Sequence, residues 1–398
     1  MKTPGRACPC CGRAGFELLL DFGNVPVSGH FRSDPTSPPM SARLAFELCT
    51  ECGLVRQAEG PGPRDYSSST RPTARQFPTY GNALIGRLKS LGVGTDDLVL
   101  DIGSNDGSFL EALRAGGYSR LVGVEPSAQL ADHARQRGFS IDNEYFGPAL
   151  VARLLERHGP ARAVICRHTL EHVPDPFAFV SALRQCMAPD AVALVEVPDG
   201  SAIPELMNVY EFWDEHLYCF CIENLRRLMD RAEMPIFEIA VHPHLETRNL
   251  LVWCGSNDFA QASTSGAPER NCTTLWRRLA RDWEAFRQRF AAAVKAAQKP
   301  VYMIGGSHSQ YNLANYAGIG GLVGHLIDDD PEKLGRIPPI LGSGPSIIST
   351  VQFEASARGG TVLKTAFGYP TWTARVCAHA ASLGMRIIDP HDFIEHHE

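Results

Sequence analysis

The stretch that decides the fold is LVLDIGSNDGSFLEAL, residues 98–113. An apolar run ends at Asp101, a turn bracketed by Gly103 and Gly107 follows, and the apolar residues after it have helical spacing. This order of strand, tight loop and helix is typical of open α/β sheets, which bind nucleotide-like ligands at the carboxyl ends of their strands. The stretch therefore predicts both a fold class and the edge of the sheet where a ligand binds.

An acidic residue follows the next apolar run. Residues 121–124 lead to Glu125, whose carboxylate can accept hydrogen bonds from both hydroxyls of a ribose. The spacing Gly-x-x-x-Gly differs from the dinucleotide fingerprint, and no phosphate-binding lysine accompanies it. These features indicate an adenosine-type ligand without a pyrophosphate, with S-adenosylmethionine (SAM) as the first candidate. The alternative is a purely structural turn, which would not need Asp101, Asn105 and Asp106 so close together.

Composition excludes several classes of function. The chain has 398 residues, enough for two or three domains, and a net charge of −6 without a basic tract, which argues against nucleic acid and anionic membranes as partners. No apolar run approaches the roughly 18 residues of a membrane span, and the N-terminus MKTPGRACPCCG has no secretory signal. We therefore expect a cytoplasmic protein whose twelve cysteines are reduced, some of them binding a metal.

Two cysteine pairs near the N-terminus indicate a zinc site. Cys8 and Cys11 form one C-x-x-C turn, Cys49 and Cys52 form another, and a glycine follows each. Two such turns present four thiolates to one tetrahedral ion, which leaves no open position for chemistry, so we expect a structural zinc. Cys10 competes as a ligand but has the poorer spacing. The alternative is two reduced turns on the surface.

The pattern along the chain predicts four parts. These are a zinc-binding domain (1–75), an α/β domain (76–258), a linker with a bridging helix (259–298) and a smaller Rossmann-like domain (299–398). Alternating strands and helices in the α/β domain predict a parallel sheet covered on both faces. The expected strands are residues 98–101, 121–125, 163–166, 192–197 and an antiparallel pair at 237–241 and 250–254.

Two polar clusters follow predicted strands. Glu215 and His216 are adjacent, and a carboxylate beside an imidazole in a loop suits a general base, although a surface pair is the alternative. His168 and His172 lie in H-x-x-E-H, which is also an inverted zinc-protease motif. Prolines directly after it would stop the helix that a protease needs, so a loop facing the substrate, or a helix-capping turn, fits better. Tyr66, in the connector before the α/β domain, can also reach such a site.

Together these motifs resemble a known family, the zinc-containing, SAM-dependent C-methyltransferases of deoxysugar pathways, which act on nucleotide-linked keto-sugars. The resemblance covers nearly the whole chain, from the four cysteines through GSNDG, LEHVPDP and the Glu-His loop to the C-terminal domain. It implies an α/β fold with a class I Rossmann-like SAM methyltransferase core, an N-terminal zinc-binding domain and a C-terminal Rossmann-like domain.

The resemblance also implies roles for individual residues. Zinc, one structural ion, would be held by Cys8, Cys11, Cys49 and Cys52. The SAM site would be lined by Asp101, Gly103, Asn105, Gly107, Glu125 and His168. The catalytic group would comprise His216 as the base, Glu215 orienting it, and His172 and Tyr66 near the ketone of the substrate. The partner would be a small molecule, nucleotide-linked and held by the C-terminal domain near Gly305–His308, and the protein would be a monomer or small homo-oligomer.

The chain departs from the family pattern where it would contact the acceptor. Trp213 replaces a tyrosine, Tyr218-Cys-Phe-Cys221 replaces a Ser-Tyr-Phe-Ser run, and Ser307-His308-Ser309 replaces a stretch with a lysine. Three alternatives therefore stay open: methylation of a different small metabolite on carbon or nitrogen, an inactive protein that binds zinc and SAM, and a zinc hydrolase at His168 and His172.

Overall fold

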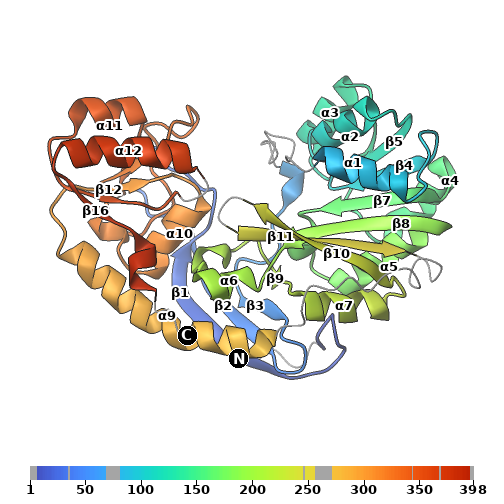
Figure 1. The fold of residues 1–398 in the computed structure, drawn as a ribbon, viewed down its shortest axis with the longest axis horizontal. Coiled ribbons are helices and arrows are strands. Elements are labelled where there is room, and N and C mark those ends of the chain that lie inside the picture. The colour runs from blue at the N-terminus through green and yellow to red at the C-terminus, as the bar shows by residue number, and fades with distance from the viewer. Residues whose placement is uncertain are drawn as a thin grey trace.

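The computed structural model describes residues 7–34, 36–68, 81–244, 247–255, 271–342, 344–366 and 369–394. Within these ranges the strands form three sheets, which lie in an N-terminal part, a central part and a C-terminal part (Figure 1). No helix in the described ranges is long and apolar enough to cross a membrane.

The central sheet has the strand order β10-β11-β8-β7-β4-β5-β6. Its strands are β4 (Leu98–Ile102), β5 (Arg120–Val124), β6 (Ser140–Asp142), β7 (Ala161–Arg167), β8 (Met187–Pro198), β10 (Ile236–His244) and β11 (Thr247–Gly255). From β6 to β8 the strands are parallel in the Rossmann order 3-2-1-4-5, and β11 and β10 extend the sheet in antiparallel fashion. The predicted parallel sheet and terminal hairpin are confirmed.

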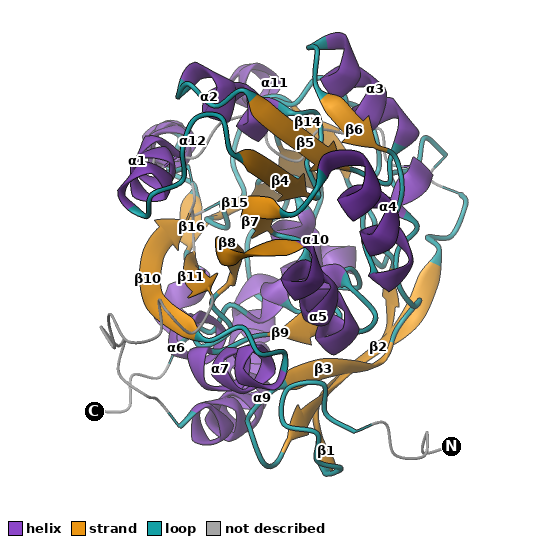
Figure 2. Ribbon diagram, turned by 90° about the vertical axis from the view of Figure 1, so that its right-hand side faces the viewer, coloured by secondary structure: helices purple, strands orange, loops and turns teal. Residues whose placement is uncertain are grey.

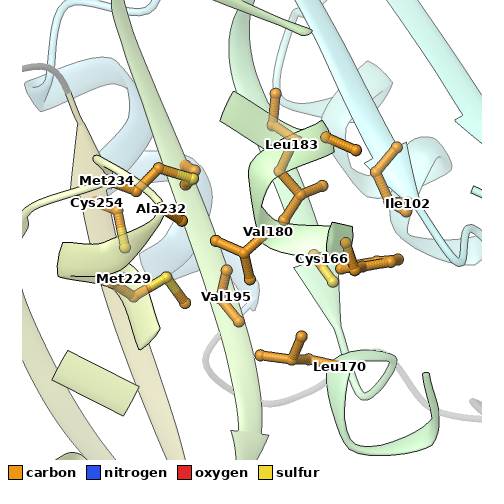
Figure 3. Packing of buried hydrophobic residues seen from close by; sticks show 14 of the residues in the cluster. Ile102, Cys166, Leu170, Val180, Leu183, Val195, Met229, Ala232, Met234 and Cys254 are labelled. Atoms are coloured by element: carbon orange, nitrogen blue, oxygen red, sulfur yellow. The ribbon is translucent and has the colours of Figure 1, made fainter. Parts of the chain in front are cut away.

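Helices cover both faces of this sheet (Figure 2). They are α1 (Gly81–Ser90), α2 (Ser108–Ala115), α3 (Ala128–Gln136), α4 (Pro148–His158), α5 (Pro176–Cys186) and α7 (Ile222–Arg231). Side chains alternate along β4: Leu98 and Leu100 face α4, α5 and α7, whereas Val99 faces α1, α2 and α3. Figure 3 shows the first of these cores, where Val180 and Leu183 of α5 pack near the sheet. This double burial explains the apolar run that identified β4.

The C-terminal sheet repeats the same order. Its strands are β12 (Val301–Ile304), β13 (His325–Ile327), β14 (Ser346–Ile348), β15 (Thr361–Leu363) and β16 (Arg386–Ile388). All neighbours are parallel, in the order β14-β13-β12-β15-β16, and the helices are α10 (His308–Tyr316), α11 (Thr350–Ser356) and α12 (Pro370–Ser382). The expected second Rossmann-like unit is therefore present.

The N-terminal sheet takes a strand from the middle of the chain. It consists of β1 (Phe16–Pro26), β2 (Ser41–Cys49), β3 (Val55–Glu59) and β9 (Tyr218–Cys219), all antiparallel. The long helix α9 (Cys272–Lys295) runs along this sheet toward the C-terminal part (Figure 1). The short helices are α6 (Ala202–Leu206), η1 (Tyr66–Ser68), η2 (Leu170–His172), η3 (Val209–Glu211), η4 (Gly320–Leu322) and η5 (Pro390–Phe393).

The N-terminal and C-terminal parts contact each other directly within one chain. Arg32 and Ile337 exchange two backbone hydrogen bonds of 2.8 Å, and the rings of Phe22 and Tyr316 stack with centroids 3.9 Å apart. These contacts hold the C-terminal unit against β1 and the segment that follows it.

Candidate active site

A cavity of about 1240 Å³ lies where the three parts meet. The central sheet contributes the loops after β4, β5 and β7, so the cavity occupies the carboxyl edge that the sequence predicted. Arg64 and Tyr66 line it from the N-terminal part, Glu125 and His172 from the core, and His308 from the C-terminal unit. The same cavity can therefore hold one ligand against the core and a second molecule against the N-terminal and C-terminal parts.

Glu125 is held by two backbone amides. The amide of Asn105 donates to its Oε2 over 2.9 Å, and the amide of Ser127 donates to its Oε1 over 2.9 Å. Burial raises the pKa of Glu125, while these two hydrogen bonds act in the opposite direction. Each carboxylate oxygen has accepted one hydrogen bond and retains lone-pair capacity, so the group is oriented yet able to bind further hydroxyls.

The two glycines of the loop meet backbone requirements. Gly103 and Gly107 have φ angles of 78° and 79°, which disfavour any residue with a Cβ. A Cβ at Gly103 would lie 2.4 Å from Oγ1 of Thr169, and one at Gly107 would lie 2.9 Å from Cβ of Ala134. Asn105, with a φ of 51°, takes the same left-handed region. The loop therefore bends tightly and brings the amide of Asn105 to Glu125.

Asp101 lies beneath this loop as a buried carboxyl group. Burial raises its pKa to about 7, nearby Arg167 opposes that rise, and the neighbouring charge of Glu125 adds to it. Asp101 lines the cavity, as expected from its place at the end of β4.

His168 is held between two buried carboxylates. Its Nε2 lies 3.2 Å from Oε1 of Glu196, and its Nδ1 lies 3.6 Å from Oε1 of Glu171. Burial would lower the pKa of His168, but the hydrogen bonds and charges of these two carboxylates raise it to about 9. Asn249 completes the group by donating to Glu196 over 2.7 Å. His168 is therefore a cation at neutral pH and is directed mainly at protein acids.

Tyr66 contacts two of the other residues that were predicted to be catalytic, Glu215 and His172. Its hydroxyl donates to Oε2 of Glu215 over 3.0 Å and lies 3.0 Å from Nδ1 of His172. Arg64 forms an ion pair with the other carboxylate oxygen of Glu215. Burial raises the pKa of Tyr66, which keeps the hydroxyl protonated and available as a donor.

His216 presents an unprotonated nitrogen. Its Nδ1 lies 3.2 Å from the backbone carbonyl of Glu211, and because a carbonyl can only accept, Nδ1 carries the hydrogen. The lone pair is then on Nε2. Burial, followed by the nearby imidazoles of His172 and His308, lowers the pKa of His216, so the ring is neutral at neutral pH. A neutral imidazole with a free lone pair has the form that a general base requires.

The expected role of Glu215 needs correction. Its carboxylate is directed to Arg64 and Tyr66, and the group that orients His216 is the carbonyl of Glu211. The reason is geometric, since adjacent side chains in this loop point to different partners. The backbone of Glu215 orients another imidazole instead, because its carbonyl accepts from Nδ1 of His172 over 2.8 Å. His172 thus has the same tautomer as His216.

The H-x-x-E-H motif does not bring its two histidines together on a metal. Of the residues that line the cavity, Glu171, His172 and His216 have ligand atoms within 4.8 Å of one another and could hold a metal ion. His168 is directed at Glu171 and Glu196, and the motif forms the short 3-10 helix η2. The geometry matches a loop at the end of a strand.

The four predicted zinc ligands come together. Cys8 and Cys52 have sulfurs 3.5 Å apart, and those of Cys11 and Cys49 are 3.7 Å apart. A zinc ion bound at about 2.3 Å places tetrahedral sulfurs roughly 3.8 Å from one another, which these distances approach. All four sulfurs lie within 4.8 Å of one another, and Cys10 is outside this group. The side-chain arrangement therefore fits a structural zinc, and none of the four cysteines lines the cavity.

Two positions that depart from the family pattern are in contact. Trp213 stacks on His308 with ring centroids 4.3 Å apart and an interplanar angle of 20°, and its centroid lies 5.1 Å from that of His216. Burial, assisted by the charge of Lys333, lowers the pKa of His308 to about 4, so this ring is neutral. The stack joins the core to the C-terminal unit beside the candidate base.

Several residues of the site were not identified from the sequence. Arg64, two positions before Tyr66, carried a weak signal as a cation in the same connector. Glu196 lies within an otherwise apolar strand and was not singled out, and nothing in the sequence indicated its contact with His168. The carbonyl of Glu211 leaves no signal at all, because every residue has one.

Comparisons with known proteins identify the central part of the chain. Residues 82–235 match the family model described as "Methyltransferase domain". The central part is a methyltransferase domain. Its sheet order and this match together assign the core to the class I Rossmann-like SAM methyltransferase fold.

Relatives of the methyltransferase domain extend over different lengths. C-methyltransferase NovU of Streptomyces niveus is 26% identical over 245 residues, which cover 58% of this chain and 56% of NovU. A ubiquinone biosynthesis O-methyltransferase of Xylella fastidiosa is 34% identical over 93 residues, 23% of this chain and 37% of that enzyme. The chain therefore spans about half or less of these relatives.

The chain is also similar, at low sequence identity, to solved structures. Magnesium protoporphyrin IX methyltransferase from Synechocystis PCC 6803 with bound SAM is 15% identical, has a TM-score of 0.37, and covers 49% of this chain and 95% of that chain.

Proposed function

We propose that the protein is a SAM-dependent C-methyltransferase that acts next to a ketone of a nucleotide-activated deoxysugar. The observation that carries the proposal is His216, a neutral imidazole with its lone pair on Nε2, in the same cavity as the Glu125 loop. Methylation of oxygen or nitrogen often needs little more than positioning, whereas a carbon must first lose a proton. The partial likeness to a C-methyltransferase supports the same class.

SAM would bind at the loop after β4. The carboxylate of Glu125, already oriented by two amides, would accept hydrogen bonds from the ribose hydroxyls. The bends at Gly103 and Gly107 let the loop approach the cofactor closely, and Asn105 and Asp101 line the same wall. Bound there, SAM supplies an electrophilic methyl group.

The residues of the chain prepare the acceptor. Nε2 of His216 removes the proton from the carbon next to the ketone, and the bonding pair moves to form an enolate. Bound SAM would supply the methyl group to that carbon, and its sulfur would keep the electron pair of the broken carbon–sulfur bond. His216 ends protonated and returns its proton to solvent. A positioned base of this kind contributes about 10²–10⁴-fold.

The enolate oxygen needs donors. Tyr66 is protonated, and its hydroxyl lies at the junction of His172 and Glu215, where a small rotation would turn it to a ligand. Arg64 adds a positive charge on the same side of the cavity. Donors aimed at a developing oxyanion are worth about 2.7–4 kcal/mol each in acyl-transfer enzymes, so this pair would be a substantial contribution.

The zinc ion would be structural. Four thiolates complete its coordination, so it takes no part in the reaction. Its site tethers the N-terminal sheet, whose strand β9 follows the loop of His216 directly. Replacement of Cys49 by serine should release the metal and lower the free energy of unfolding. A stable, metal-free Cys49→Ser protein would contradict a structural zinc.

The nucleotide end of the acceptor would lie against the C-terminal unit. Lys333 and Arg336 line the cavity there, and Arg336 donates to the carbonyl of Phe31 and lies over its ring, with 5.7 Å to the ring centroid. Cations beside an aromatic ring suit a diphosphate and a base. A different small acceptor is the second candidate, and the Trp213–His308 stack favours it, because the pair narrows the space beside the base.

The test separates proton removal from methyl transfer. The protein is incubated in deuterium oxide with S-adenosylhomocysteine and a panel of nucleotide-linked keto-deoxysugars, and mass spectrometry follows exchange at the carbon next to the ketone. We expect exchange without methylation, then methylation when SAM replaces the product. Methyl transfer to an oxygen or nitrogen, with no exchange at carbon, would contradict C-methylation and leave the second candidate.

A further inference from the structure

A second group of metal-ligating side chains lies outside the cavity and the four-cysteine site. Cys221, Glu223 and Cys272 place two sulfurs and a carboxylate oxygen within 4.8 Å of one another. Sγ of Cys272 donates to Oε2 of Glu223 over 2.9 Å. The three residues come from two segments that are distant in the sequence: Cys221 and Glu223 lie at the start of α7, and Cys272 lies at the start of α9.

The group is enclosed by the fold. Cys221 is 0% exposed and Cys272 is 4% exposed. The second zinc-binding turn packs against it, since a Cβ added at Gly53 would lie 3.1 Å from Cβ of Cys272 and 3.2 Å from the amide nitrogen of Thr273. A ligand here would therefore be held between the N-terminal sheet, the methyltransferase domain and the bridging helix.

Both cysteines lie at the start of a helix. Cys221 is the N-cap residue of α7, and Cys272 is the first residue of the 24-residue helix α9. The positive end of a helix stabilises negative charge, and thiolates are the form in which cysteine binds metals. Two such ends converge on one carboxylate, which makes the donor set Cys₂Glu. The hydrogen bond with Cys272 and burial raise the pKa of the Cys221 thiol, so the bound cation itself must supply most of the charge that stabilises a thiolate here.

We propose that Cys221, Glu223 and Cys272 form a second metal site, selective for a thiophilic divalent cation such as Zn²⁺. Binding would release the two thiol protons to solvent, replace the hydrogen bond between Cys272 and Glu223, and leave one coordination position for water. The ion would join the start of α9 to α7, and so fix the bridging helix on the methyltransferase domain. This site does not depend on the proposed reaction or on the acceptor.

The test uses cobalt(II), whose thiolate complexes absorb strongly, on the full-length reduced protein freed of metal. We expect two equivalents to bind per chain, with the second set of thiolate bands lost in Cys221→Ser and Cys272→Ser. Serine is a preferred N-cap residue, so Cys221→Ser keeps the cap of α7, and the cap of α9 is the side chain of Asn271. These two variants should therefore fold.

Two further variants sharpen the result. Glu223→Gln should weaken the second equivalent by at least 10-fold while its thiolate bands remain in weaker form. The matched control is Cys377→Ala, a partly buried cysteine in α12, which should bind two equivalents like the wild type.

Three outcomes would overturn the proposal. The first is one equivalent in the wild type with all twelve thiols reduced. The second is a second equivalent that survives both serine variants. The third is a disulfide between Cys221 and Cys272 in the protein as isolated, detected by non-reducing peptide mass spectrometry, because oxidised sulfurs do not serve as thiolate ligands.

Discussion

The methyltransferase core and the C-terminal unit have the same strand order and the same hydrogen bond at the turn after their first strand. Both sheets have the order 3-2-1-4-5, and in both an acid at the end of the second strand receives an amide from the loop after the first. Asn105 donates to Glu125 over 2.9 Å in the core, and Gly306 donates to Asp328 over 2.9 Å in the C-terminal unit. In both units, therefore, a backbone amide of the loop after the first strand is bound by the acid that follows the second strand.

The two acids differ in what else they touch. The carboxylate of Glu125 receives backbone amides, whereas Asp328 also forms an ion pair of 2.9 Å with Lys333. A carboxylate that is oriented but not neutralised can accept the hydroxyls of a ribose. Asp328 is paired instead with Lys333, and of these two residues Lys333 lines the cavity. Two sheets of the same order thus carry acids with different partners, and we propose that the cofactor binds the core.

The largest expected effect comes from a residue that belongs to neither turn. His216→Asn should lower the turnover number by about 10²-fold or more, because only the proton-accepting nitrogen is lost. SAM affinity, measured by calorimetry, should stay unchanged because the Glu125 loop is intact. Wild-type turnover in this variant would remove His216 as the base and direct attention to His172, which has the same tautomer.

Replacing each of the two acids tests whether they have different roles. Glu125→Ala should weaken SAM binding by about 10-fold to 100-fold, the range expected for hydrogen bonds to a charged group. Asp328→Asn is the matched control and should leave SAM affinity unchanged. Equal effects of the two substitutions would mean that the acids have the same role, and the distinction between the two units would fail.

The contact between the two units has a smaller expected effect. The rings of Trp213 and His308 stack across the cavity wall, so Trp213→Leu and His308→Leu should each raise the KM for the acceptor by several-fold. A double-mutant cycle should give a coupling of about 0.5–1.5 kcal/mol. Additive effects would show that the stack does not shape the acceptor site.

The smallest expected effect is a dependence of stability on pH. The folded-state pKa of His168 is raised to about 9, above the unfolded value of about 6.5. Its contribution to the free energy of unfolding is therefore complete below about pH 6.5 and is lost as pH rises through about 9. Urea denaturation of wild type and His168→Gln across this window should show a fall that the variant lacks. Parallel curves would contradict a protonated His168.

Strong local patterns explain what the sequence predicted correctly. Strand β4 was predictable because it is buried on both faces, which produces an uninterrupted apolar run. The turn at Gly103 and Gly107 was predictable because only glycine tolerates its positive φ angles at low cost. The cysteine pairs were predictable because a metal site requires fixed ligand types at fixed spacing.

Long-range contacts explain what the sequence left hidden. Strand β9 has two residues, too few for a periodic signal, and it forms only through its pairing with Val55 and Arg56. The carbonyl of Glu211 orients His216, and backbone atoms carry no sequence signature. The ion pair of Arg64 with Glu215 joins segments that only the folded chain brings together. These tertiary interactions redirected Glu215 away from its predicted role.

The most direct test of the account is calorimetric titration of the purified protein with SAM and, separately, with thymidine diphosphate, each repeated with the other ligand present. We expect one SAM per chain and one nucleotide per chain, each bound with the other in place. Failure to bind SAM, or displacement of SAM by the nucleotide, would contradict the assignment of the cofactor to the core and the acceptor to the C-terminal unit.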